Sequence, residues 1–149
     1  MNGRNYLIPV DAKIDTAMSV PTEGISVDQI IDRNNRVSII ILDACRDNPF
    51  VSANASSISP YRGISTGLAL INAPTNTLIA FSTAPGKIAA DGSGDNGLYT
   101  AELVRAIDTP RTSIETVFKE TRMGVIAKSG ETQIPWESSS LTADFSFNP

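Results

Sequence analysis

An apolar run at residues 37–42 constrains the fold of this chain more than any other stretch. It reads VSIIIL, with only Ser38 interrupting the β-branched and aliphatic residues. A short run of this kind is typical of a strand buried on both faces, as in the middle of a parallel sheet. The run stops at Asp43, and the only cysteine, Cys45, follows two residues later. Because ligands bind beyond the carboxyl ends of the strands in open α/β sheets, the run predicts a thiol at such a position.

The segments before this run predict a β–loop–α–β order. Residues 6–8 favour a short strand, and residues 11–24 favour a surface loop because they are mixed and contain proline and glycine. Ser26 can cap a helix over about 27–34, which leads into the apolar run. This order is typical of α/β folds.

The second half predicts another buried strand and two helices. Residues 77–82 form a second apolar strand that ends in a Pro-Gly turn. We expect a helix over about 98–107 whose core side is formed by Leu98, Ala101, Val104 and Ile107. A further helix is expected over about 114–128, capped by Thr112 or Ser113 and closed by Gly130. A last short strand at 133–137 and an edge strand at Phe145 and Phe147 complete the prediction.

Composition places the chain among soluble globular proteins and excludes several functions. The 149 residues suffice for a single domain, within which residues 51–67 predict a flexible linker because they are rich in Ser, Asn, Gly and Pro. A net charge of −4 without a basic cluster gives nucleic-acid binding no support. The longest apolar run is far short of the roughly 20 residues that a membrane span needs. The compartment stays open.

Cys45 has two interpretations from its position alone. A thiol is a useful nucleophile only as the thiolate, which needs a cation, a helix N-terminus or a base beside it. The other interpretation is a small buried hydrophobic residue that ends the strand. Asp43 is likewise either a functional carboxylate or one that turns or caps a loop. The glycine-rich residues 92–97 lack the endings of phosphate-binding loops and predict a flexible loop.

The combination of motifs resembles the caspase-like clan of cysteine peptidases, in its bacterial metacaspase and orthocaspase form. IIILDACRDNPF at 39–50 is similar to the strand that carries the catalytic cysteine, with Asp-x-Cys in place of Gln-Ala-Cys. FSTAPG at 81–86 resembles the wall of the primary specificity pocket, GLYTAELVRAI the helix after it, and GRNYLIPVDA the strand after the histidine loop. The resemblance covers almost the whole chain. It implies a three-layer α/β/α sandwich with a mostly parallel central sheet, and a cysteine endopeptidase.

The resemblance also implies roles for individual residues. Cys45 would be the nucleophile, with its backbone N–H in the oxyanion hole. Asp43 would lie at the base of the primary specificity pocket, and Asp91 would offer a second carboxylate there. Two carboxylates suit the guanidinium of arginine or the ammonium of lysine, so the implied cleavage is after Arg or Lys. Ser82 and Ala84 are expected to offer backbone groups to an extended substrate.

One departure from the family limits these expectations. The sequence has no histidine, whereas the family's catalytic histidine lies about 50 residues before the cysteine, which falls just before residue 1. We therefore expect a truncated domain that lacks its N-terminal elements and, alone, its activity. Its partners would then be a peptide substrate and the missing part of the same domain. The alternative is a non-catalytic binding or regulatory module. An unrelated α/β hydrolase or nucleotide-binding domain would need a serine elbow or a phosphate loop, and neither is visible.

The linker contains a single basic residue, Arg62, in SPYRGIS. If the pocket takes arginine, Arg62 is the natural autoprocessing site; the alternative is a solvated loop charge. Calcium activates some relatives, but Asp43, Asp47, Asp91 and Asp95 form no recognisable calcium loop. We therefore predict no metal and no cofactor.

Overall fold

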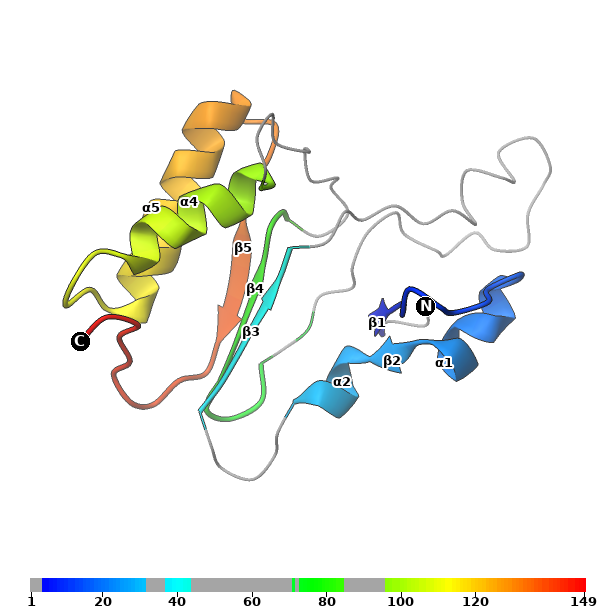
Figure 1. The fold of residues 1–149 in the computed structure, drawn as a ribbon. Helices are drawn as coiled ribbons and strands as arrows, with labels where there is room; N and C mark the ends of the chain where they lie inside the picture. Colours follow the sequence, from blue (N-terminus) through cyan, green and yellow to red (C-terminus); the bar gives the residue numbers. More distant parts are fainter. Residues whose placement is uncertain (1–3, 32–36, 44–70, 72, 85–95) are drawn as a thin grey trace.

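The computed structural model describes residues 4–31, 37–43, 71, 73–84 and 96–149 (Figure 1). Its centre is a three-stranded sheet in the order β3–β4–β5. β3 (Ser38–Leu42) and β4 (Thr77–Phe81) pair in parallel, and β5 (Trp136–Ser139) pairs antiparallel with the other side of β4. Both buried strands predicted from the apolar runs are confirmed. The described part of the sheet is mixed, with one parallel and one antiparallel pair.

Helices cover the two faces of this sheet and make the predicted α/β sandwich. Along β4, Leu78 and Ala80 point to α4 (Leu98–Ile107) and α5 (Ile114–Ser129), which Figure 1 shows together on one side. Ile79 and Phe81 point to the opposite face, where they form a second cluster with Val27 and Ile31. Burying one such side chain stabilises the fold by about 1.5–3 kcal/mol, so β4, buried along its whole length, anchors both layers.

The N-terminal part of the chain forms a small unit beside this sheet. β1 (Tyr6–Leu7) pairs antiparallel with β2 (Ile25–Ser26), and α2 (Val27–Ile30) follows directly. The Ser26 backbone N–H donates to Gln29 Oε1 at 3.1 Å, which fits the predicted helix start. Residues 11–24 are not the continuous loop that we expected, because they contain η1 (Ala17–Ser19) and α1 (Val20–Glu23).

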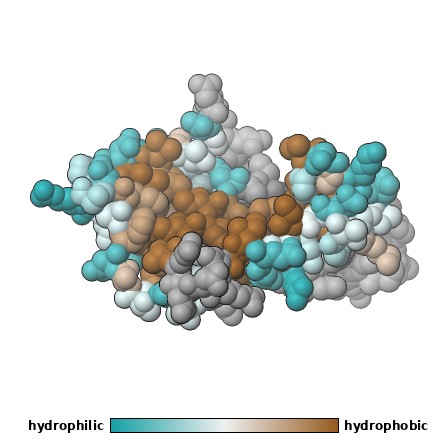
Figure 2. All heavy atoms as spheres, turned by 60° about the horizontal axis from the view of Figure 1, so that its bottom comes forward, coloured by the Kyte–Doolittle hydropathy of each residue, from teal (hydrophilic) through white to brown (hydrophobic). Residues whose placement is uncertain are grey.

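Apolar surface remains around β3 in this arrangement. Figure 2 shows hydrophobic residues gathered between the α4–α5 part and the N-terminal unit. Val37 and Ile41 are 45% and 36% exposed, and among the residues described here β3 pairs only with β4. No helix in the described part of the chain is long and apolar enough to cross a membrane.

The ends of α5 follow the sequence prediction, whereas the end of the chain does not. Ser113 caps the helix by accepting a hydrogen bond from Thr116 N at 3.3 Å, and Gly130 closes it in the left-handed conformation with φ 59°. The edge strand expected at Phe145 and Phe147 is absent from this described segment. The two rings instead meet edge to face at 5.2 Å and pack on the α4–α5 side of the core.

The buried face of α4 differs from the predicted one. Val104 is 52% exposed and Ala101 is exposed, while Leu98 and Ile107 are only partly buried. The side that faces the core is formed by Tyr99, Glu102, Leu103 and Ala106. The prediction for the buried face of α4 included only apolar residues. It is wrong because the Glu102 carboxylate is buried there.

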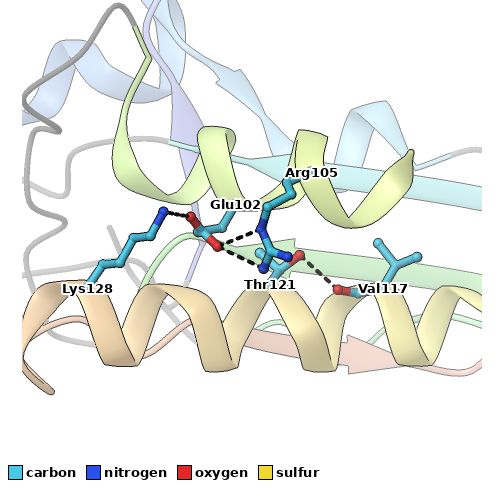
Figure 3. Close-up of polar contacts among 5 residues, drawn as sticks. All are labelled: Glu102, Arg105, Val117, Thr121 and Lys128. Atoms are coloured by element: carbon cyan, nitrogen blue, oxygen red, sulfur yellow. Dashed lines mark hydrogen bonds and ion pairs between the residues drawn. The ribbon is translucent and has the colours of Figure 1, made fainter. Parts of the chain in front are cut away.

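Glu102 is buried because α4 and α5 supply it with two cations (Figure 3). Lys128 Nζ lies 2.5 Å from Glu102 Oε1, and Arg105 donates from two nitrogens to Oε2 at 3.0 and 3.2 Å. The Glu102 side chain is 3% exposed. The hydrogen bond from Lys128 is the main cause that lowers the pKa of Glu102 below its usual value, against the opposing effect of burial. The carboxylate therefore ties the two helices together in its charged form.

We expect the Glu102→Gln variant to lose stability in a pH-dependent manner. At pH 7 the free energy of unfolding should fall by about 1–3 kcal/mol, because hydrogen bonds to a charged group are lost. A lowered pKa in the folded state gives stability that is present above the unfolded pKa of about 4.3 and is lost as pH falls through the folded value. Urea unfolding at pH 7 and pH 3 should show the gap between variant and wild type closing at low pH. The exposed Glu23→Gln serves as control, and a pH-independent gap would contradict the ion-pair role.

Candidate active site

The candidate site lies where three strands meet the start of α4. Asp43 follows β3, and Ser82, Thr83 and Ala84 follow β4. The parallel register Leu42↔Phe81 brings these strand ends side by side, and the antiparallel pairing Phe81↔Trp136 adds the first residue of β5. This edge is the one at which open α/β sheets bind ligands.

The carboxylate of Asp43 is exposed and contacts the first turn of α4. Thr100 Oγ1 donates to Asp43 Oδ2 at 2.5 Å. A Cβ on Gly97, the N-cap residue of α4, would lie 3.3 Å from the same oxygen, so glycine allows this close approach. A negative charge at the N-terminus of a helix is favourable because the helix dipole is positive there.

Tyr99, next to Thr100, adds a buried hydroxyl to the surroundings of Asp43. The residue is 1% exposed, and its Oη has no hydrogen-bond partner among the residues described. Burial raises the pKa of Tyr99 well above its ordinary value, and the negative charges of Asp43 and Glu137 act in the same direction. The hydroxyl therefore stays protonated and able to donate.

The end of β4 is held by the segment after α5. Gln133 Nε2 donates to Ser82 O at 2.7 Å, and Ser82 N donates to Leu42 O at 3.1 Å. Ser82 thus uses its N–H and its carbonyl oxygen within the fold, and the residue is buried. That Ser82 and Ala84 contact a substrate backbone stays a prediction.

A side chain of α5 contacts the start of β5. Arg122 forms an ion pair with Glu137, and its Nε donates to Pro135 O at 3.1 Å. Both side chains are partly exposed. In the described part of the chain, no three acidic, histidine or cysteine side chains gather closely enough to hold a metal ion.

The structure brings three of the predicted site residues to this edge. Asp43, Ser82 and Ala84 all follow the paired strand ends. Cys45, Asp91, Arg62 and the linker 51–67 lie outside the described residues, so their predicted roles stay predictions.

Sequence reasoning missed Gly97, Thr100 and Gln133. A usable signal existed for two of them. A helix that follows a strand of a parallel pair begins near the carboxyl edge of the sheet, so GLYT at 97–100 was a candidate neighbour of Asp43. Gln133 carried no comparable signal, because its partner Ser82 is 51 residues away in the chain.

Comparisons with known proteins place the chain in a family. The family model described as the caspase domain matches residues 1–146. No curated protein matches. Among solved structures, the crystal structure of caspase-1 from Spodoptera frugiperda is 18% identical, with a TM-score of 0.49 over 72% of this chain. This chain covers 46% of that caspase chain, which is less than half of its length. On the strength of the family model, the chain belongs to the caspase-domain family of cysteine peptidases.

Proposed function

We propose that these residues form the cysteine-bearing part of an endopeptidase that cleaves after arginine or lysine. The observation that carries the proposal is the placement of Asp43. Its exposed carboxylate is held at the carboxyl end of β3, two residues before the chain's only thiol. Membership of the caspase-domain family supports Cys45 as the nucleophile.

In this proposal the Cys45 thiolate attacks the carbonyl carbon of the scissile bond. A carbon–sulfur bond forms, the carbonyl electrons move to the oxygen, and the Cys45 N–H donates to that oxyanion. A base takes the proton of the Cys45 thiol and returns it to the leaving amine when the intermediate collapses and the C–N bond breaks. Water then hydrolyses the acyl-enzyme, which releases the acid product and restores the thiol. The sequence contains no histidine, so the base is either another kind of side chain or a group supplied from outside these 149 residues.

The preference for basic residues follows from the charges proposed for the pocket. The Asp43 carboxylate would accept hydrogen bonds from a guanidinium or ammonium group, and Asp91 would supply the second negative charge. Acidic side chains would be repelled from such a site. The Asp-x-Cys sequence at 43–45 supports a relationship to the metacaspase and orthocaspase type.

The test is cleavage of fluorogenic peptides that end in Arg, Lys or Asp by the full-length protein. We expect release from the Arg and Lys peptides only, and complete loss in Cys45→Ala. Cleavage of the Asp peptide alone would contradict the proposed pocket. The absence of histidine favours a second candidate, a non-catalytic caspase-fold binding module, which predicts no cleavage of any peptide.

A further inference from the structure

Three residues at the N-terminal end of α4 act on one carboxylate. Thr100 donates to Asp43 Oδ2 at 2.5 Å, Gly97 leaves room for that oxygen, and Tyr99 interacts electrostatically with the same side chain. The Tyr99 hydroxyl is buried without a hydrogen-bond partner among the described residues. A buried donor usually has a hydrogen-bond partner, and the described residues do not supply one here.

We infer that Thr100 is a positioning residue that aims the Asp43 carboxylate at the basic side chain of a substrate. The inference rests on the proposed function and names a determinant of its specificity. With Oδ2 held by the Thr100 hydroxyl, we assign Oδ1 as the oxygen that accepts from the substrate cation. The Thr100 oxygen keeps its own lone pairs, so it offers a second acceptor beside Oδ1.

The contact between Thr100 and Asp43 contributes little to the stability of the fold. The Thr100–Asp43 hydrogen bond is exposed, and such bonds contribute little to stability. α4 is attached to the sheet by the buried side chains of Leu103 and Ala106 instead. The contact matters for substrate binding instead. A carboxylate that is already oriented loses less side-chain freedom when the substrate binds.

The test compares Thr100→Val, which removes the hydroxyl at nearly constant shape, with Thr100→Ser, which keeps it. In the full-length protein we expect Thr100→Val to raise KM for Arg and Lys peptides about tenfold, with kcat changed by less than about twofold. Thr100→Ser should restore the wild-type KM. Gly97→Ala, which crowds Asp43 Oδ2 without touching Thr100, should also raise KM.

Thr142→Val is the matched control. Thr142 Oγ1 also donates an exposed hydrogen bond, at 2.6 Å to Asn76, but at the opposite end of β4. The Thr142→Val variant should leave KM for the Arg and Lys peptides unchanged. An unchanged KM in Thr100→Val, or a raised KM that serine does not restore, overturns the inference while the proposed function stands.

A binding measurement separates this inference from the proposed function. Agmatine, a small guanidinium compound, is titrated by calorimetry into Cys45→Ala and into Cys45→Ala with Thr100→Val. Binding about tenfold weaker in the double variant supports the positioning role even if no peptide is cleaved, in which case only the peptidase proposal fails. Equal agmatine affinity in the two proteins, or no binding to either, overturns the positioning role.

Discussion

We expect Asp43→Asn to lower kcat/KM for Arg- and Lys-ending peptides about a hundredfold in the full-length protein, because the proposed charged pair with the substrate would be replaced by a neutral contact. The asparagine keeps an oxygen that can accept from Thr100, so the change tests the charge and leaves the shape of the site in place. For a peptide ending in citrulline, the neutral counterpart of arginine, Asp43→Asn should lower kcat/KM far less. The measured quantity is the ratio of kcat/KM for the arginine peptide to kcat/KM for the citrulline peptide.

The control for this prediction is Asp108→Asn. Asp108 is an exposed aspartate at the opposite end of α4, where it is the C-cap residue. The Asp108→Asn variant should leave the ratio of kcat/KM for the arginine and citrulline peptides unchanged. If Asp43→Asn lowered cleavage of both peptides equally, Asp43 would act on something other than the substrate charge, and the proposed pocket would be wrong.

Gly124→Ala should destabilise the fold, although alanine in a helix interior usually stabilises by about 1 kcal/mol relative to glycine. A Cβ at this position of α5 would lie 2.8 Å from Glu102 Cδ and closer still to Oε2. The Glu102 side chain cannot easily yield, because it is buried and held by Lys128 and Arg105. We expect the free energy of unfolding to fall by about 1–3 kcal/mol, the usual cost of overpacking. Urea unfolding measures it.

A double-mutant cycle provides the control for this change. In a Glu102→Ala background the space opposite residue 124 is open, so Gly124→Ala should become neutral or stabilising by up to about 1 kcal/mol. The coupling energy between the two positions is then large, because Glu102→Ala removes the destabilisation that Gly124→Ala causes. If Gly124→Ala had the same effect in both backgrounds, the close approach of Glu102 to α5 would not be the reason for the glycine.

Local patterns predicted those elements whose residues all favour one structure. The β-branched run at 38–42 and the apolar residues at 77–81 form the two strands that were expected. α5 has a serine cap, a glycine end and an apolar face, and all three agree. At each of these positions propensity, patterning and tertiary packing point the same way.

The misses arise where a tertiary contact overrides the local pattern. In α4 the apolar residues favoured one face, but the face that is buried carries Glu102, whose carboxylate is paired with Arg105 and Lys128. Phe145 and Phe147 have the alternation of a strand, yet their rings meet each other edge to face and pack against the core. The Thr100–Asp43 contact spans 57 residues, so only the general rule that places the start of such a helix near the carboxyl edge of the sheet could have suggested it.

The parallel pairing of β3 with β4 has a consequence for the autoprocessing predicted at Arg62. A cut between Arg62 and Gly63 would leave β3 on one piece of chain and β4, α4, α5 and β5 on the other. The two pieces would still share the backbone ladder from Ser38↔Thr77 to Leu42↔Phe81, and the cluster that joins Leu42 to Ile79 and Phe81. A nicked molecule would therefore migrate as two bands under denaturing conditions and as one particle under native ones.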